Sequence, residues 1–203
     1  TYRFSFVTNG TRNATSTNIG DYNAFVQAAA DAGSLNLSGA TWRALASTEA
    51  DNARVHTGTV GSGGESIFKV DGVSKVANNY GDLWNGLAQA TEVPNMDENG
   101  TVLGVQVFTG TTSGGSTVTD RWLGTTTISN NQLRVTRGLT NRNNSGRWMQ
   151  QFNNSPTSQL HLYALSDALT VREAGGNAVP EPATATLALL GLSGLMMRRR
   201  RNA

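Results

Sequence analysis

Apolar and polar residues alternate over residues 2–8, and an Asn-Gly pair follows at residues 9–10. Alternation is typical of a half-buried strand, and Asn-Gly is common in the turns that end strands. Over residues 21–31 the apolar residues recur every three or four positions. This spacing predicts a helix with Asp21 in its N-cap region and Gly33 at its end. The apolar positions of this helix are Tyr22, Phe25, Val26 and Ala29.

Shorter apolar segments follow among long polar loops. Residues 41–46, 105–108 and 160–165 are predicted to be strands, and residues 49–55 a short helix. No internal repeat is found at any period, so a repeat architecture is not expected.

The last part of the chain has a different pattern. Apolar and small residues fill positions 183–197, and Arg198, Arg199, Arg200 and Arg201 follow directly. In helical form this run spans about 22 Å, slightly less than the roughly 30 Å hydrocarbon core of a bilayer. The arginines are held on the cytoplasmic side by the positive-inside rule. The pattern therefore predicts a C-terminal transmembrane helix, with the rest of the chain on the outer side of the inner membrane.

Pro180 and Pro182 flank Glu181 immediately before the apolar run. The prolines prevent the helix from extending upstream and leave an extended segment at the membrane surface, which a protease can recognise. The preceding small residues have the composition of a flexible linker, and a length of 203 residues fits one domain with appendages. The predicted divisions are a domain at residues 1–172, a linker at 173–178 and a tail at 179–203.

The Pro180-Glu181-Pro182 motif, the short apolar helix and the arginine cluster occur together and in order. This arrangement resembles the PEP-CTERM sorting signal of exopolysaccharide-producing Gram-negative bacteria. The resemblance implies that an exosortase, a membrane-embedded peptidase or transpeptidase, recognises the motif and removes the helix. The chain would then be a precursor inserted in the inner membrane, followed by a product at the cell surface or in the extracellular matrix. A plain C-terminal membrane anchor and a buried core helix are the alternatives.

The excess of positive charge is concentrated in the tail. The whole chain has 16 basic and 14 acidic residues, but without residues 179–203 the count is 12 basic and 13 acidic, since four arginines and Glu181 are removed. The domain is therefore close to neutral, and nucleic acid is not expected as a partner. Cysteine is absent, which excludes disulfides and thiolate chemistry. The chain begins at Thr1 without an apolar leader, and we interpret it as a form whose signal peptide has been removed.

A series of motifs in residues 1–172 resembles the endostatin-like branch of the C-type-lectin-like fold. The resemblance implies an α+β domain of small antiparallel sheets, with a principal helix early in the chain and long loops. The motifs are Asp21-Tyr22-Asn23-Ala24-Phe25, Thr41-Trp42-Arg43-Ala44-Leu45, Tyr80-Gly81-Asp82-Leu83-Trp84-Asn85-Gly86, Asp97-Glu98-Asn99-Gly100, Val107-Phe108-Thr109-Gly110-Thr111, Arg121-Trp122 and Leu162-Tyr163-Ala164.

Members of that family carry two disulfides, which the resemblance places at Ala24 with Ala164 and at Thr119 with Pro156. If these correspondences hold, Ala24 and Ala164 face each other in the core. A domain without these bonds has to rely on packing, since a native disulfide is worth about 2–5 kcal/mol in a small secreted domain. We therefore expect the tryptophans to be core residues rather than a stacking platform for sugars. They are Trp42, Trp84, Trp122 and Trp148.

A lectin-type calcium site is not expected. Val93 interrupts the Glu-Pro-Asn element in the segment from Glu92 to Asn95, and Gly86 stands where a second carboxylate is required. Calcium takes about six to eight oxygen ligands, several of them carboxylates. The sequence therefore predicts neither a metal nor a cofactor.

Candidate catalytic residues are few. Asp97 and Glu98 precede Asn-Gly, which indicates a turn more than a paired-carboxylate site. His161 is expected to pack on a strand, and residues 61–64 to form a flexible loop. No nucleophile elbow is present.

We interpret the chain as a non-enzymatic binding or structural domain exported through the PEP-CTERM pathway. Its partner could be a polysaccharide or another surface ligand, and the sequence does not distinguish these alternatives. The alternatives are a calcium-independent carbohydrate-binding module, which would show exposed aromatic residues in one groove, and a hydrolase of matrix polymers, which would need two carboxylates across a cleft.

Overall fold

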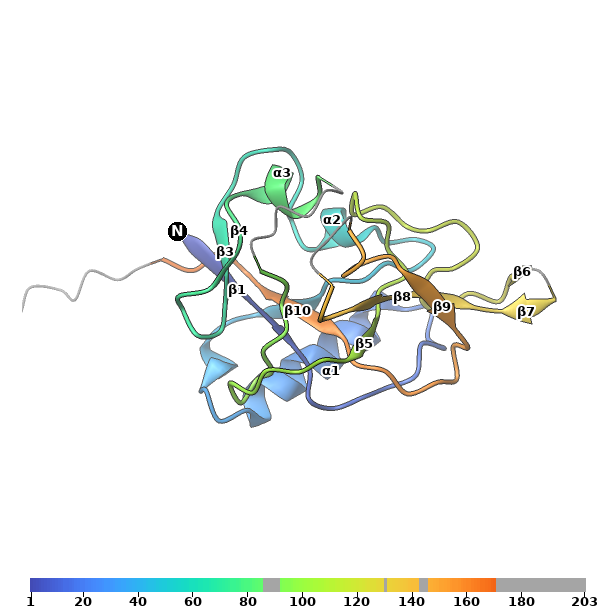
Figure 1. The fold of residues 1–203 in the computed structure, drawn as a ribbon, viewed down its shortest axis with the longest axis horizontal. Coiled ribbons are helices and arrows are strands. Elements are labelled where there is room, and N and C mark those ends of the chain that lie inside the picture. The colour runs from blue at the N-terminus through green and yellow to red at the C-terminus, as the bar shows by residue number, and fades with distance from the viewer. Residues whose placement is uncertain (86–91, 130, 143–145, 171–203) are drawn as a thin grey trace, which may run out of the picture. The chain divides into compact units, whose positions relative to one another are not determined.

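The computed structural model describes residues 1–85, 92–129, 131–142 and 146–170. All of them belong to one compact unit, Thr1–Thr170, whereas the second unit, Val171–Ala203, lies outside the described residues. Figure 1 shows the first unit as one long helix with short strands and long loops. Its helices are α1 (Ile19–Ala32), the 3-10 helix η1 (Leu37–Gly39), α2 (Ala53–His56) and α3 (Tyr80–Leu83).

The strands of this unit form a five-stranded sheet, a three-stranded sheet and a two-stranded hairpin. The larger sheet contains β1 (Tyr2–Val7), β2 (Trp42–Ala44), β3 (Ser66–Lys69), β4 (Lys75–Ala77) and β10 (Tyr163–Ser166). The smaller sheet contains β5 (Gln106–Phe108), β8 (Val135–Leu139) and β9 (Phe152–Asn154), and the hairpin is formed by β6 (Ile128–Ser129) and β7 (Gln132–Leu133).

The larger sheet has the strand order β2-β10-β1-β3-β4, with β1 at its centre (Figure 1). Strand β1 pairs antiparallel with β10 but parallel with β3. The expectation of antiparallel sheets is therefore wrong for this pair. The connection from β1 to β3 passes through α1 and β2, and a crossover of this length permits parallel pairing. The mixture of small sheets with few helices confirms the α+β class.

Helix α1 confirms the helix predicted over residues 21–31, although it begins two residues earlier, at Ile19. The N-cap is Asn18, whose Oδ1 accepts a hydrogen bond from the backbone N–H of Gly20 at 2.9 Å. Asp21 lies in the first turn, where a negative charge is favourable near the positive end of the helix dipole. The cap therefore comes from an asparagine that the apolar pattern did not single out.

The predicted pairing of Ala24 with Ala164 in the core is wrong. Ala164 is fully buried, but Ala24 lies on the exposed side of α1. The buried side of the helix carries Tyr22, Val26 and Ala30, which recur every four residues along one face. The alignment with the disulfide-bonded family therefore fails at this position.

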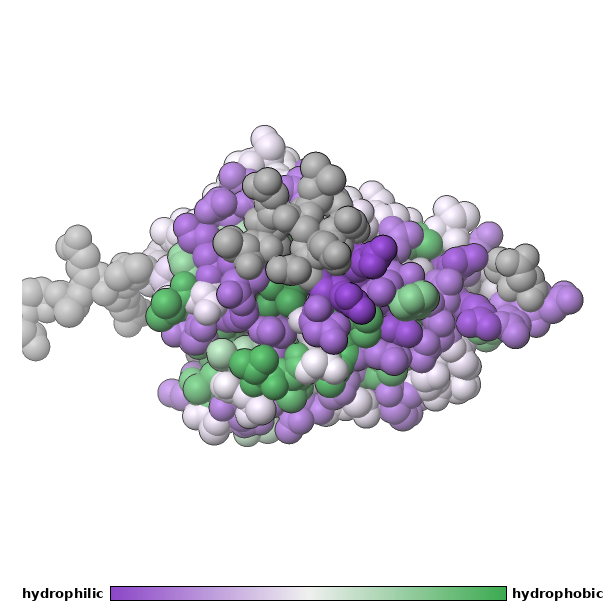
Figure 2. Space-filling view, in the orientation of Figure 1, coloured by the Kyte–Doolittle hydropathy of each residue, from purple (hydrophilic) through white to green (hydrophobic). Residues whose placement is uncertain are grey.

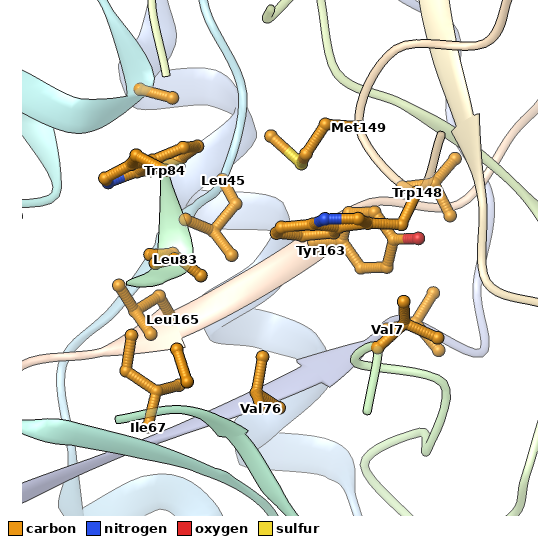
Figure 3. Packing of buried hydrophobic residues seen from close by; sticks show 14 of the residues in the cluster. Val7, Leu45, Ile67, Val76, Leu83, Trp84, Trp148, Met149, Tyr163 and Leu165 are labelled. Atoms are coloured by element: carbon orange, nitrogen blue, oxygen red, sulfur yellow. The ribbon is translucent and has the colours of Figure 1, made fainter. Parts of the chain in front are cut away.

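Both faces of the larger sheet are covered by apolar side chains. Phe6 and Ala164 pack with Tyr22 and Val26 of α1 in one cluster. Neighbouring strand residues point the other way, and Tyr163 is among those that form a second cluster (Figure 3). Because both faces are covered, the four residues of β10 are all buried and show no alternation.

The smaller sheet joins the two clusters. Val107 of β5 belongs to the cluster of Tyr163, and its neighbour Phe108 belongs to the cluster of Tyr22. Strand β8 lies between β5 and β9, and Gly138 in its centre pairs with Val107. The backbone of Trp148 approaches Gly138 so closely that a Cβ there would lie 1.6 Å from the Trp148 carbonyl oxygen.

Buried hydroxyl groups connect segments that are distant in sequence. Ser5 Oγ donates to the carbonyl of Ala164 at 2.7 Å, and Thr109 Oγ1 donates to that of Met149 at 2.6 Å. Ser47 Oγ accepts from the N–H of Ala53 at 2.9 Å, at the start of α2. A buried donor or acceptor left unpaired costs about 1–3 kcal/mol. These contacts stabilise a domain that has no disulfides.

The other predicted elements are found with shifted ends. The strand predicted at 105–108 is β5, the one at 160–165 begins later as β10, and the helix predicted at 49–55 is reduced to Ala53–His56. Strands β3, β4, β8 and β9 were not predicted. They are short and contain polar residues, so their sequences give little periodicity.

Candidate functional site

The candidate carboxylate Asp97 is the centre of a turn. Its Oδ1 accepts hydrogen bonds from the backbone N–H of Asn99 at 2.9 Å and of Thr101 at 2.7 Å. Gly100 has a φ of 85°, a left-handed conformation that glycine adopts without strain. Asp97 is 2% exposed. The prediction of a turn is confirmed, because the carboxylate of Asp97 accepts its hydrogen bonds from backbone groups of that turn.

The neighbouring Glu98 holds two other segments. Its Oε2 accepts from the N–H of Asn9 at 2.9 Å, and its carbonyl accepts from the N–H of Leu35 at 3.4 Å. Burial raises the pKa of Glu98, and the nearby charge of Asp97 adds to this effect. The two carboxylates therefore bind different segments of the chain. This arrangement does not favour the hypothesis that they act together as a catalytic pair.

The raised pKa of Glu98 predicts a pH-dependent stability. A carboxyl group whose pKa is higher in the folded than in the unfolded state favours folding below its unfolded value, and this contribution is lost as the pH rises through the folded value. Glu98→Gln is never ionised, so relative to the parent it is expected to gain stability at pH 7 and none at pH 3.5. Urea unfolding at both pH values measures the difference. Glu49→Gln removes an exposed carboxylate and serves as the control. A loss of stability at pH 7 for Glu98→Gln would show that the ionised form is required.

Both histidines bind backbone carbonyl groups. His161 Nδ1 lies 2.6 Å from the carbonyl oxygen of Thr8, so this nitrogen carries a proton. His56 Nε2 lies 2.8 Å from the carbonyl of Ala44, and its Nδ1 lies 3.2 Å from that of Asn52. Burial lowers the pKa of His56 despite these two acceptors. The ring of His56 links α2 to β2, and the ring of His161 links the segment before β10 to the residue after β1.

The region considered for calcium has a different arrangement. Glu92 forms an ion pair with Lys69, which is 4% exposed. Asn95 has a buried side-chain oxygen without a hydrogen-bond partner. Gly86 lies outside the described residues. Within the described residues no three histidine, aspartate or glutamate side chains gather as a metal site.

Three of the tryptophans are core residues, as predicted. Trp42 is 2% exposed, and Trp84 and Trp148 are each 4% exposed. The indole N–H of Trp42 donates to the carbonyl of Leu37, and that of Trp84 to Thr59 Oγ1, both at 2.9 Å. Trp122 is half-buried, so the prediction of burial holds only partly there.

A buried arginine, Arg3, was not predicted from the sequence. Arg3 is 8% exposed, donates from Nη1 to the carbonyl of Thr57 at 2.8 Å, and forms an ion pair with Glu65 at 3.5 Å. Its guanidinium lies 5.2 Å from the ring centre of Tyr80, whose hydroxyl donates to Glu65. The hydrogen bond from Tyr80 lowers the pKa of Glu65. The alternation of polar residues in β1 placed Arg3 on one face, but only the fold brings Glu65 to it.

The loop at residues 61–64 packs against Tyr80, which belongs to the group formed with Arg3 and Glu65. Its Gly63 carbonyl accepts from the backbone N–H of Tyr80 at 2.8 Å. Gly64 lies against the ring of Tyr80, because a Cβ there would be 2.3 Å from a ring carbon. The loop therefore packs on the ring of Tyr80.

An exposed aromatic residue, Phe152 of β9, was also not predicted from the sequence, and it is 53% exposed. The guanidinium of Arg137 on the adjacent strand lies 5.1 Å from the centre of its ring. An exposed phenylalanine within a polar stretch has no periodic pattern that marks it. Only the pairing of β8 with β9 shows which side chains surround it.

The predicted sorting residues lie outside the described residues. They are Pro180, Glu181, Pro182, Arg198, Arg199, Arg200 and Arg201, and the transmembrane helix predicted at 183–197 also falls there. Among the helices that the structure does describe, none has both the length and the apolar character to cross a membrane.

Comparison with known proteins identifies the tail. No curated protein matches the chain. The resemblance of residues 1–172 to the C-type-lectin-like fold therefore stays an interpretation of their motif order. Residues 178–201 match the family model of the PEP-CTERM protein-sorting motif. The chain thus carries a PEP-CTERM motif, which marks an exported protein processed at the membrane by an exosortase.

Proposed function

We propose that residues 1–172 are a non-enzymatic binding or structural domain, which the tail delivers to the cell surface or the exopolysaccharide matrix of a Gram-negative bacterium. The observation that carries the proposal is the match of residues 178–201 to the PEP-CTERM motif. Within it, Pro180, Glu181 and Pro182 form the recognition element, and Arg198 to Arg201 fix the orientation in the inner membrane.

The contacts in the domain support a non-catalytic role. Asp97 and Glu98 bind backbone amides of their own turn and of Asn9, and both histidines bind carbonyl groups. Groups held in this way stabilise loops, which agrees with the proposed structural role. The C-type-lectin-like character of the domain is also part of the proposal. The early helix and the small sheets agree with it, although the Ala24 correspondence does not.

A second candidate is a calcium-independent carbohydrate-binding module. The exposed ring of Phe152 beside Arg137 favours it, because aromatic faces stack on sugar rings and guanidinium groups bind polar ligands without a metal. The burial of Trp42, Trp84 and Trp148 removes these tryptophans from such a role.

Localisation tests the proposal. The full chain, expressed behind a secretory signal peptide, is expected to reach the cell surface or matrix in a host that has an exosortase. In the same host without the exosortase it should stay in the inner membrane as the longer form. Immunoblots of membrane, surface and medium fractions measure this, and an exported reporter without the tail is the control. Identical distribution of the chain in both hosts would contradict the proposal.

A further inference from the structure

The domain is near neutral as a whole, but its charges are unevenly distributed along the chain. Residues 121–166 contain arginines and neither aspartate nor glutamate. Asp120 and Asp167 lie immediately outside this segment. The segment includes β6, β7, β8 and β9, which form one end of the unit in Figure 1. Hydrophilic residues cover most of that end in Figure 2. The arginines are Arg121, Arg134, Arg137, Arg142 and Arg147.

Three of these arginines contact the edge strand β9, Arg134 and Arg137 from β8 and its start, and Arg121 from an earlier loop. Arg137 Nε donates to Asn154 Oδ1 at 2.9 Å, and Arg134 Nη1 donates to the carbonyl of Asn153 at 3.5 Å. Arg121 Nη1 donates at 2.8 Å to the side-chain oxygen of Asn153, in the amide orientation that satisfies both ends of that group. All three contacts are with uncharged groups. Among the described residues, none of these arginines forms an ion pair with a carboxylate.

Unpaired polar atoms lie next to β9, on Arg137 of β8 and on Gln151, which directly precedes β9. Arg137 Nη1 is buried and has no hydrogen-bond partner, and neither has the buried side-chain oxygen of Gln151. Phe152 presents an exposed ring directly opposite Arg137 in the register of the two strands. An open hollow of about 410 Å³ lies where β9 ends. Its lining residues are Gln132, Leu133, Arg134 and Ser155.

We propose that this surface, which we call the β9 surface and define by Arg121, Arg134, Arg137, Phe152, Asn153 and Asn154, binds an acidic polysaccharide through the carboxylates of its uronic acid residues. The proposal rests on the binding role proposed above and names its ligand class. Guanidinium groups bind carboxylates with strong, charge-assisted hydrogen bonds. The ring of Phe152 offers a face for a sugar ring, and the asparagine amides offer partners for hydroxyl groups.

A polysaccharide fits the surface better than a nucleic acid does. Outside residues 121–166 the domain carries acidic residues beside its other basic residues, so the unbalanced positive charge lies in this one segment and an extended basic face, as in nucleic-acid-binding domains, is not expected. One exposed aromatic ring among amide groups suits a sugar. No calcium is required, because the arginines supply the positive charge.

The test uses the full chain purified in detergent and two forms of one polymer. Polygalacturonate carries free carboxylates, and fully methyl-esterified pectin has the same sugar backbone without the charge. We expect saturable binding of polygalacturonate by isothermal titration calorimetry and at least tenfold weaker binding of the ester. Both titrations are made in the presence of a chelator. The titration with polygalacturonate is repeated at high salt, where binding between charged groups weakens.

Variants locate the binding on the β9 surface. Arg137→Gln is expected to weaken polygalacturonate binding about tenfold, and Phe152→Ala about fivefold. Arg134 is exposed, so Arg134→Gln should preserve the fold and still weaken binding about threefold. Arg43→Gln removes an arginine that pairs with Asp167 away from this surface and should leave binding unchanged. Circular dichroism checks that each variant is folded.

Several results would overturn the proposal. They are no binding of polygalacturonate at millimolar concentration, equal binding of the ester, equal effects of Arg43→Gln and Arg134→Gln, or tighter binding of single-stranded DNA than of polygalacturonate. The assay needs no exosortase. A failure here therefore leaves the localisation result intact, and a failure of localisation leaves this binding result intact.

Discussion

When Pro180, Glu181 and Pro182 are all replaced with alanine, the chain is expected to accumulate as its longer, membrane-retained form in a host that has an exosortase. The apolar run at 183–197 and the four arginines after it are unchanged, so insertion and orientation should be preserved. Alanine removes both fixed φ angles and allows the helix to extend upstream, so the extended segment that we propose as the recognition element is lost. Immunoblots of membrane fractions against the parent chain detect the mass difference.

The linker supplies a matched control for this experiment. Replacing Gly175, Gly176 and Asn177 with alanine changes the same number of residues just outside the matched range of 178–201. Processing of this control should equal that of the parent. If the variant of the Pro-Glu-Pro motif is trimmed and released as well, the motif is a spacer, and either another protease acts on the tail or the tail is a simple anchor.

Gly138→Ala is expected to prevent folding or to destabilise the domain by at least about 4 kcal/mol, a large part of the roughly 5–15 kcal/mol that keeps a domain folded. The added Cβ would lie 1.6 Å from the carbonyl oxygen and 2.3 Å from the carbonyl carbon of Trp148. Both are backbone atoms, so no side-chain rotation relieves the overlap. The backbone of Met149 is also close, at 2.9 Å. Thermal unfolding and the near-ultraviolet signal of the buried Trp148 measure the loss.

Gly104→Ala is the control for this substitution. Gly104 is exposed, and a Cβ there meets no atom within 4 Å. The free energy of unfolding of the Gly104→Ala variant should differ from that of the parent by less than about 1 kcal/mol, because alanine mainly restricts the unfolded chain. A folded Gly138→Ala protein with a near-parental melting temperature would show that the segment at Trp148 does not pack on β8 as described.

The sequence alone was sufficient to predict the sorting motif and the two elements with the clearest periodicity, β1 and α1. In the tail, the length of the apolar run, the position of the arginines and the prolines act locally, so no tertiary contact is needed to recognise them. Strand β1 and helix α1 were predicted because each has a clear periodicity over several residues. Their approximate ends followed from Asn-Gly after the strand and Gly33 after the helix.

The tertiary structure decided the pairings between distant segments. The parallel alignment of β1 with β3 and the contact of Arg3 with Glu65 depend on the path of the chain between them. The exposure of Ala24 depends on which face of α1 lies against the sheet. In the same way, the arginines of the β9 surface come from separate positions in a polar stretch without periodicity. Only the pairing of β8 with β9 places Arg137 beside Phe152, because side-chain neighbours in a sheet are set by register and not by sequence distance.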